Sequence, residues 1–356
     1  MSRREGIARP LDRHNKEVAQ SIETELVAFL AHARDDMEAL DPRAAGLVDE
    51  IARILGAGGK RIRPLLCYWG HRAFGGASTR EIVRAAASLE LLHTFAIIHD
   101  DVMDRAETRR GSPTTHRLAA EGRPGHESVH FGISVAVLTG DLAFALSDRL
   151  FLGSGFPPEA VERALPALHE MRLAAVAGQF LDLSESGSGE DAESAKRIAR
   201  LKTASYSVRG PLLIGAALAG RSGPGLLALG AFGDCVGEAF QLHDDLLGMF
   251  GDPASTGKDR AGDVRTGRPT LLMAEALRGI DEAGREKILK AYGRPGAEAE
   301  EVLAVAEAVE ETGAPERVRL RIERLHRQGV DALKNAGDLE PPAVEALSSL
   351  AGRILE

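Results

Sequence analysis

The chain has 356 residues, and its 44 Lys+Arg against 53 Asp+Glu give a formal net charge of −9 at pH 7. This balance argues against a general nucleic-acid-binding protein, which needs a surplus of basic residues, and an aromatic content of 4% argues against base-stacking platforms. The apolar fraction of 44% and the charged fraction of 27% exclude long-range disorder and are typical of a soluble globular protein.

Apolar residues recur at three- and four-residue spacing along almost the whole chain, and alternating strand-like stretches are scarce. Ala, Leu, Glu and Arg dominate, and turn signals rich in Gly and Pro divide the pattern into helical segments. We therefore expect an all-α, single-domain helical bundle over residues 1–356. The longest helices are predicted at about 12–39, 78–104, 128–152, 158–186, 194–219 and 225–250.

Neither secretion nor membrane insertion is expected. The N-terminal stretch MSRREGIARPLDRHN is charged and contains no apolar segment of the kind that a secretory signal requires. No stretch approaches the roughly 20 apolar residues that span a bilayer. Cys67 and Cys235 lie far apart in mainly apolar or small-residue surroundings, so we expect reduced thiols packed in the core. These features predict a cytoplasmic protein without stable membrane insertion.

The segment GGKRIRP, residues 58–64, places a glycine pair and three cations at the start of a helix. It is not a Walker A loop, because Arg61 replaces the Ser/Thr and the first glycine of that motif is missing. Glycines, helix N-terminal N–H groups and Lys or Arg side chains are nevertheless what diphosphate binding requires. Each cation alone is also compatible with an ordinary surface.

The segment HDDVMD, residues 99–104, ends a long predicted helix with three carboxylates. Asp100 and Asp104 lie about 40° apart on one helix face, and Asp101 flanks them. Their mutual repulsion and the helix C-terminus both disfavour this cluster unless a cation binds there. Oxygen ligands favour a hard ion, Mg²⁺ first, and Mg²⁺ is commonly shared with phosphates. An acidic, solvated helix end is the alternative for this cluster alone.

A second acidic pair, Asp244 and Asp245, ends the segment FQLHDD inside a strongly apolar predicted helix. Gln241 lies one turn before Asp244 on the same face. Burying such a pair without a cation is costly, so the two acidic motifs could face each other across a bundle and form a metal cluster. Further polar residues accompany the two motifs. His93 lies seven residues before Asp100, on nearly the same helix face. The others are Arg109-Arg110-Gly111 after the first motif, Lys202-Thr203, and Lys258 and Arg268 after the second.

The order GGKRIRP, HDDVMD with a following RRG, KT, and FQLHDD with a following GK resembles the trans-isoprenyl diphosphate synthases. The match runs from about 58 to 272, the motif-bearing core, and residues 270–356 are expected to complete the bundle. The resemblance implies an all-α bundle around a deep apolar cavity, and a homodimer. It also implies Mg²⁺, three ions with Mn²⁺ as a substitute, and two substrates, isopentenyl diphosphate and an allylic diphosphate, which condense head to tail.

The resemblance assigns roles residue by residue. Asp100, Asp104 and Asp244 are the expected metal ligands, with Asp101 and Asp245 supporting or bridging them. Arg109 is expected to bind the allylic diphosphate, and Lys60, Arg63, His93 and Arg110 the isopentenyl diphosphate. Lys202, Thr203, Gln241 and Lys258 are expected around the reacting diphosphate and the developing carbocation.

Product length in this family depends on residues below the first acidic motif. Phe95, five positions before Asp100, together with a motif without insertion, resembles a geranylgeranyl (C20) producer. Ala96 and Leu92 lie nearer the Asp100 face by helical geometry, so the wheel alone does not explain a role of Phe95. Farnesyl (C15) and longer (C25 and above) products remain open.

Two positions depart from the family pattern: Gly248 stands where a third acid is common, and Arg268 where Lys is common. These departures leave open a non-catalytic regulatory subunit of another prenyl synthase, although such a subunit would more often lack the first acidic motif or GGKRIRP. A terpene cyclase is less consistent, since it has no use for GGKRIRP and carries an Asn/Ser/Glu-type second motif.

Overall fold

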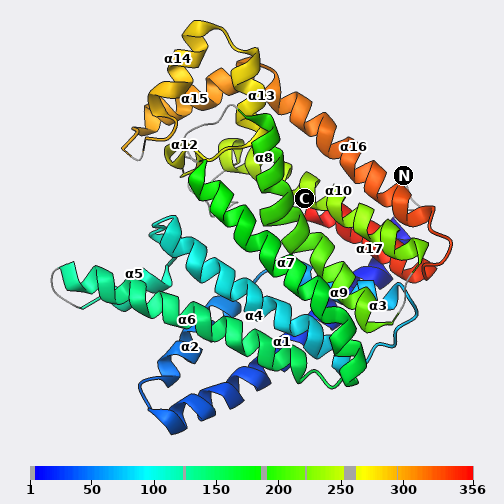
Figure 1. Cartoon of the computed structure of the whole chain (residues 1–356). Helices are drawn as coiled ribbons and strands as arrows, with labels where there is room; N and C mark the ends of the chain where they lie inside the picture. Colours follow the sequence, from blue (N-terminus) through cyan, green and yellow to red (C-terminus); the bar gives the residue numbers. More distant parts are fainter. Residues whose placement is uncertain are drawn as a thin grey trace. The chain divides into compact units, whose positions relative to one another are not determined.

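The computed structural model describes residues 5–122, 126–185, 191–220, 223–251, 262–294 and 296–355. Within these residues the chain is almost entirely helical, and strand pairing is confined to one hairpin, β1 (Thr108–Arg109) with β2 (Ser112–Pro113) (Figure 1). The all-α class predicted from the sequence is therefore confirmed. The chain forms two compact units, one comprising residues 1–163 and 215–220, the other 164–214 and 221–356. Each unit is interrupted in sequence by the other, and a single domain over the whole chain stays a prediction.

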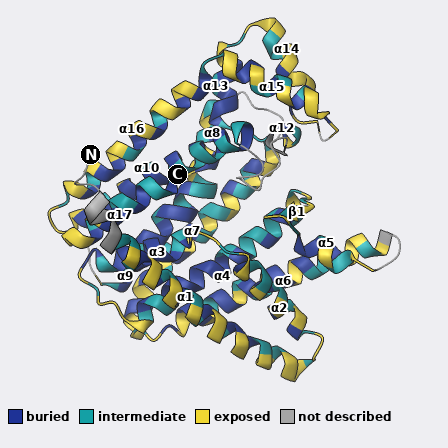
Figure 2. Ribbon diagram, turned by 180° about the vertical axis from the view of Figure 1, so that it is seen from behind, coloured by how far each residue is buried: buried dark blue, intermediate teal, exposed yellow. Residues whose placement is uncertain are grey.

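The first unit is organised around α4, the helix that ends in the first acidic motif. Its Ala- and Leu-rich middle, from Ala85 to Leu92, is buried at every position, and Figure 2 shows α4 in a mixture of the buried and intermediate colours. α4 packs most extensively against α6, and also against α3 and α1. The elements of this unit are α1 (Glu5–Leu40), α2 (Ala45–Gly56), α3 (Ile62–Arg72), α4 (Arg80–Met103), the hairpin, α5 (Thr115–Ala120), α6 (His126–Leu152) and the start of α7 (Pro158–Ser184).

The second unit is organised around α10, the helix that carries the second acidic motif. α10 packs against the π-helix η1 and against α16, and its residues Leu242 and Leu246 join a core with Leu272 and Val305. The elements of this unit are most of α7, α8 (Ala192–Ile198), η1 (Ala199–Arg209), the start of α9 (Gly210–Leu218), α10 (Pro224–Phe250), α12 (Gly262–Thr266), α13 (Leu271–Gly279), α14 (Glu282–Ala291), α15 (Ala299–Glu311), α16 (Ala314–Lys334) and α17 (Pro341–Ile354).

The long predicted helices correspond to α1, α4, α6, α7 and α10 within a few residues, except that α1 begins earlier. The predicted helix at 194–219 differs in kind, because it is divided into α8, the eleven-residue π-helix η1 and α9. Both cysteines are free thiols, as expected; Cys67 is buried in the core, whereas Cys235 is only partly buried. Burial raises the pKa of the Cys67 thiol to about 12.

Two helices in the described part of the chain are long and apolar enough to cross a membrane, by length and composition only. This corrects the expectation that no segment is apolar enough to span a bilayer. That expectation considered only uninterrupted apolar runs, whereas a helix that contains a few polar residues can still be apolar enough on average. The most apolar part of α4 is 67% buried, as is typical of a core helix, whereas that of α6 is only 33% buried.

Candidate functional site

The three carboxylates of the first acidic motif lie at the end of α4. The helix ends at Met103, and the capping residue Asp104 still donates its backbone N–H to the Asp100 carbonyl at 2.8 Å, so these two residues share a face as predicted. Asp101 is only 4% exposed, and burial raises the pKa of its carboxyl. Arg109 opposes that shift through its positive charge and through the hydrogen bond that its Nε donates to Asp101 Oδ1 at 2.7 Å. Arg109 Nη2 also lies 3.5 Å from Asp100 Oδ2.

The β1–β2 hairpin brings the Arg-Arg-Gly sequence back to the GGKRIRP loop. The tight turn places Arg110 (φ 52°) and Gly111 (φ 75°) in the left-handed region. Arg110 donates through Nη1 to the Gly58 carbonyl, so two motifs that are 52 residues apart in sequence are in direct contact. This contact places Arg110 beside the loop, and a shared substrate site stays a prediction.

His93 on α4 is surrounded by the cations of this region. Burial lowers its pKa well below the usual value, and Arg63, Arg109, Arg110 and Arg61 lower it further. His93 is therefore neutral near pH 7 and offers hydrogen bonds rather than charge. The structure thus places Arg63 and Arg110 near His93, while Lys60 is exposed on the same loop.

The predicted chain-length residues lie on α4 one to two turns before the acidic motif. Leu92 is 1% exposed, while Phe95 and Ala96 are half-buried. The Phe95 ring packs edge-on against Phe144 of α6, with centroids 5.1 Å apart, and against His99 at 4.7 Å. Phe95 therefore contacts α6 as well as its own helix, and a helical wheel of α4 alone does not contain the α6 contact.

Lys202 and Thr203 lie in the π-helix η1, and glycines of two neighbouring helices make room for this wider helix. A β-carbon at Gly178 of α7 would lie 2.4 Å from the Lys202 backbone nitrogen, and one at Gly237 of α10 would lie 2.4 Å from Ala204 Cα. Neither distance is compatible with any side chain. Because π-helical turns are rare and are frequently found at functional sites, this geometry supports a special role for Lys202 and Thr203.

Polar side chains of the second unit form two connected groups. Thr203 donates to Gln241 Oε1, and Gln241 Nε2 donates to Asp245 Oδ1 at 2.7 Å. The second group centres on Asp182 of α7. Lys202 Nζ donates to Asp182 Oδ2 at 2.6 Å, and Arg268 Nε lies 3.5 Å from the same oxygen. A cavity of about 40 Å³, large enough for water, is lined by residues of both groups: Asp182, Lys202, Gln241, Asp245 and Arg268.

The remaining members of the second motif differ in burial. Asp244 is partly exposed, Asp245 is only 7% exposed, and Gly248 is buried. Lys258 lies outside the described residues, so its predicted role is not placed.

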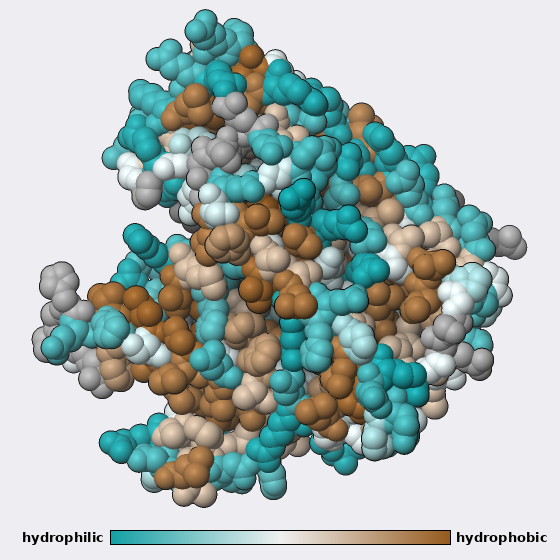
Figure 3. All heavy atoms as spheres, viewed as in Figure 1, coloured by the Kyte–Doolittle hydropathy of each residue, from teal (hydrophilic) through white to brown (hydrophobic). Residues whose placement is uncertain are grey.

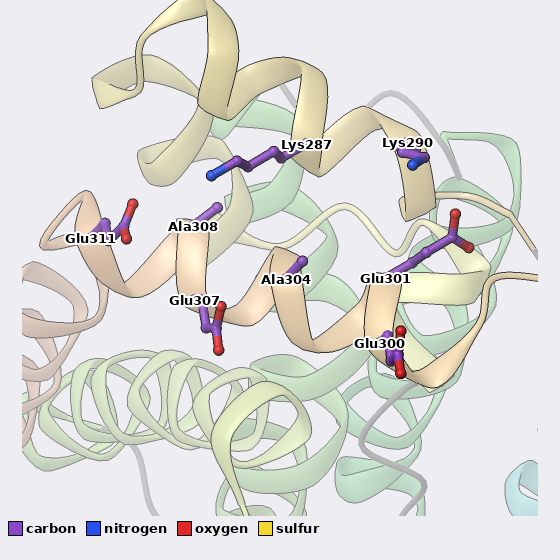
Figure 4. Close-up of a pocket in the computed structure, with 8 residues that line it drawn as sticks. All are labelled: Lys287, Lys290, Glu300, Glu301, Ala304, Glu307, Ala308 and Glu311. Atoms are coloured by element: carbon purple, nitrogen blue, oxygen red, sulfur yellow. The ribbon is translucent and has the colours of Figure 1, made fainter.

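A larger cavity of about 300 Å³ lies between α14 and α15 and contains no predicted site residue. Figure 4 shows Lys287 and Lys290 projecting from α14, and Glu300, Glu301, Glu307 and Glu311 from α15. These lysines and glutamates carry opposite charge on neighbouring helices, which is typical of solvated surface.

Among the described residues, no group of three or more His, Cys, Asp or Glu side chains forms a ready-made metal cage. Mg²⁺ does not need one, because it usually retains waters and binds through one or two carboxylates together with substrate phosphates. Asp100 and Asp104, one turn apart at a helix end, provide such a pair of hard oxygen donors. The donor chemistry of the first motif therefore fits Mg²⁺.

Two charged residues were not predicted from the sequence: Glu90, which accepts a hydrogen bond from Arg61, and Asp182, which accepts one from Lys202; Arg61 was predicted only as one of the three GGKRIRP cations. Glu90 and Asp182 are single carboxylates inside otherwise apolar helical stretches, and both are 5% exposed. A lone acid on a buried helix face is the sequence signal that could have identified them, because such a group requires a partner.

The region that carries these motifs is also the region that resembles known proteins. The sequence profile of the polyprenyl synthetase family matches residues 46–310. The chain is 33% identical over 308 residues to the geranylfarnesyl diphosphate synthase of Aeropyrum pernix, covering 85% of this chain and 92% of that protein. It is 30% identical over 299 residues to the geranylgeranyl diphosphate synthase of Sulfolobus acidocaldarius, covering 83% and 86%. The crystal structure of geranylgeranyl pyrophosphate synthase from Corynebacterium glutamicum, complexed with isoprenyl diphosphate and magnesium, is similar with a TM-score of 0.91 and 35% identity, covering 96% of this chain and 98% of that chain.

Proposed function

Because the chain belongs to the polyprenyl synthetase family and is a trans-prenyltransferase that makes a short-chain isoprenyl diphosphate, we propose that its product is geranylgeranyl diphosphate (C20). The observation that supports this length is Phe95, an aromatic ring five residues before Asp100 and packed between Phe144 and His99. A bulky ring at this depth limits the space for a growing tail. Relatives at about 30% identity include geranylgeranyl and geranylfarnesyl synthases, so the side chains of this chain must decide between them.

Asp100, Asp104 and Asp244 are the proposed Mg²⁺ ligands, for three ions, with Mn²⁺ as a substitute. Asp101 and Asp245 are the proposed supporting carboxylates, because Arg109 binds Asp101 and Gln241 donates to Asp245. Bound Mg²⁺ supplies positive charge to the departing diphosphate.

The cations divide between the two substrates. Arg109 is the proposed contact to the allylic diphosphate, and Lys60, Arg63 and Arg110 those to isopentenyl diphosphate, while the neutral His93 adds a hydrogen bond. Lys202, Thr203, Gln241 and Lys258 are proposed to surround the reacting centre.

In the reaction, the allylic C–O bond breaks and its electron pair leaves with the diphosphate. The isopentenyl double bond attacks the resulting cation, and a proton is lost to the released diphosphate. Lys202 stabilises the negative charge that develops on the leaving oxygen. No side-chain nucleophile takes part.

Purified protein tests this function with Mg²⁺, labelled isopentenyl diphosphate and C5, C10 and C15 allylic primers. We expect extension of each primer to a C20 product, read by chromatography of the dephosphorylated alcohols. Incorporation that stops at C15 or continues to C25 would correct the product length. No incorporation with any primer would favour a regulatory subunit instead.

Replacing Phe95 with alanine is expected to lengthen the product by one or more isoprene units, because the ring that blocks the tail is removed. The measurement is the product-length distribution with a C15 primer. Phe151→Ala on α6 is the control, since Phe151 is a buried ring that has no predicted role in length. An unchanged distribution in Phe95→Ala would reject Phe95 as the length-determining residue.

We also propose a homodimer that covers the exposed face of α6. Val129, Ile133 and Val137 follow one another at four-residue spacing and are 48%, 36% and 40% exposed, and Phe131 and Leu138 are also exposed. Figure 3 shows apolar side chains gathered along this helix. Monomeric soluble proteins rarely expose contiguous apolar patches of this kind, and a second copy of α6 related by a two-fold axis supplies a self-complementary cover.

Introducing charge into this stripe, as Ile133→Glu with Val137→Glu, is expected to convert the dimer to a monomer, because two desolvated carboxylates would face each other across the two-fold axis. Light scattering after size exclusion measures the mass. Val27→Glu on α1 is the control, because Val27 is a single exposed apolar residue at 71%. A wild-type protein that is monomeric, or that sediments with neutral lipid vesicles, would contradict the dimer proposal.

A further inference from the structure

Arg61, the middle cation of GGKRIRP, differs from its neighbours because it points into the protein. It is 8% exposed and stands directly before α3 with φ 49° and ψ 38°, in the left-handed region. A residue with a β-carbon is strained in this conformation, so the surrounding contacts must hold it there.

Those contacts come from three helices of the first unit. Arg61 Nη1 donates to Glu90 Oε2 of α4 at 2.9 Å, and Nη2 donates to the Leu55 carbonyl at the end of α2 at 2.7 Å. Nε lies 3.4 Å from Glu23 Oε1 of α1. The side chains of Arg61 and Glu90 are 8% and 6% exposed, so this is a buried ion pair. A guanidinium with donors committed to three partners is oriented toward the core.

The loop before Arg61 is held from a second direction. Gly58 and Gly59 both have positive φ, and the Gly58 carbonyl accepts a hydrogen bond from Arg110. A β-carbon at Gly59 would lie 3.6 Å from both Arg110 Nη2 and Arg61 Nη1, so the two guanidinium groups border this glycine. The backbone between them carries Lys60, and the turn after Arg61 carries Arg63. Both proposed substrate cations therefore depend on the conformation of Arg61.

Glu90 lies in the middle of a strongly positive region. Burial lowers the pKa of Arg110, Arg109 and Arg61 lower it further, and Glu90 opposes these effects. The carboxylate therefore reduces the positive potential that attracts a diphosphate, and its presence needs another explanation. Holding Arg61 in its strained conformation is such an explanation.

We propose that Arg61, held by its buried ion pair with Glu90, is a positioning residue that sets the GGKRIRP loop for binding isopentenyl diphosphate. The inference rests on the proposed function, because it refines one of the two substrate sites. It assigns no direct substrate contact to Arg61, in contrast to Lys60 and Arg63.

The variant Glu90→Gln tests this role, because the direction of the change in KM for isopentenyl diphosphate distinguishes a positioning role from direct binding. It preserves the side-chain shape but removes the charge that holds Arg61. We expect KM for isopentenyl diphosphate to rise about 10- to 100-fold, the range expected for one lost charged hydrogen bond. KM for the allylic substrate and kcat at saturation are expected to change less than about twofold. If Arg61 instead bound the diphosphate directly, loss of the opposing negative charge would lower that KM.

Arg61→Lys provides the second comparison, because it keeps the charge but cannot reproduce the three contacts. It is expected to raise the same KM, whereas a role in electrostatic attraction alone would leave KM nearly unchanged. Glu25→Gln is the matched control. It weakens the Arg80–Glu25 pair, which also joins α1 to α4, but the Arg80 side chain of that pair is largely exposed.

Thermal melting with and without inorganic diphosphate gives a readout that does not depend on turnover. The inference predicts a smaller diphosphate-induced rise in Tm for Glu90→Gln and Arg61→Lys than for the wild type and Glu25→Gln. An equal rise in all four proteins, a lowered KM, or equal KM increases for both substrates would overturn it. Failure of the proposed function is a separate result, namely no turnover by the wild type with any primer.

Discussion

Exchanging Asp100 for asparagine is expected to lower Mg²⁺-dependent condensation roughly 10³-fold, the upper range for loss of one preorganised electrostatic contribution to a transition state. The expected cause is loss of a metal ligand rather than loss of folding. Asp100, Asp101 and Asp104 repel one another at a helix C-terminus, where negative charge is already disfavoured. Removing one charge leaves Arg109 bound to Asp101 at 2.7 Å, so the local structure is retained.

Two measurements separate these effects. Single-turnover rates at saturating substrates report catalysis, and urea unfolding without Mg²⁺ reports stability, which we expect to be equal to or higher than that of the wild type. Asp49→Asn is the control for turnover, because Asp49 is an exposed partner of Arg34 with no site role. Turnover within a few-fold of wild type in Asp100→Asn would refute the metal-binding role.

Helical periodicity is enough to predict most long helices of this protein, because their apolar faces are set by local spacing. It does not predict the π-helix η1, because that geometry depends on Gly178 and Gly237 in helices far away in sequence. It also does not predict the hairpin after α4. Its turn requires positive φ at Arg110, a residue type that gives no strong turn signal.

In the candidate site, too, some features follow from local sequence and others from residues that are distant in sequence. Acidic and basic motifs are visible in the sequence because several like charges at helical spacing are costly without a ligand. Their partners are not visible, since Asp182 meets Lys202 across 20 residues and Glu90 meets Arg61 across 29. Sequence therefore predicts which residues bear the chemistry, whereas the groups that hold those residues in place emerge only from tertiary contacts.

Exchanging Asp182 for asparagine is the second substitution with a large expected effect. Asp182 is 5% exposed and is shared by Lys202, at 2.6 Å, and Arg268, at 3.5 Å. Neutralising it leaves two cations around an amide, and breaking a buried pair by removing one partner costs about 3 kcal/mol in the free energy of unfolding. We also expect kcat to fall about 10²-fold, because Lys202, the proposed contact to the leaving diphosphate, loses its Asp182 partner.

A double-mutant cycle with Lys202→Met distinguishes these consequences. The double variant is expected to recover about 1 kcal/mol or more of the stability lost in Asp182→Asn, because the unpaired cation nearest the site is removed, but none of the lost kcat. Glu238→Gln is the matched control, since its pair with Arg321 in the same unit is more exposed, at 24% and 33%, and is expected to cost less than about 1 kcal/mol. Additive stability losses at Asp182 and Lys202 would show that the two residues are not coupled. An unchanged kcat in Lys202→Met would mean that the Asp182 contact stabilises the fold without orienting a catalytic group.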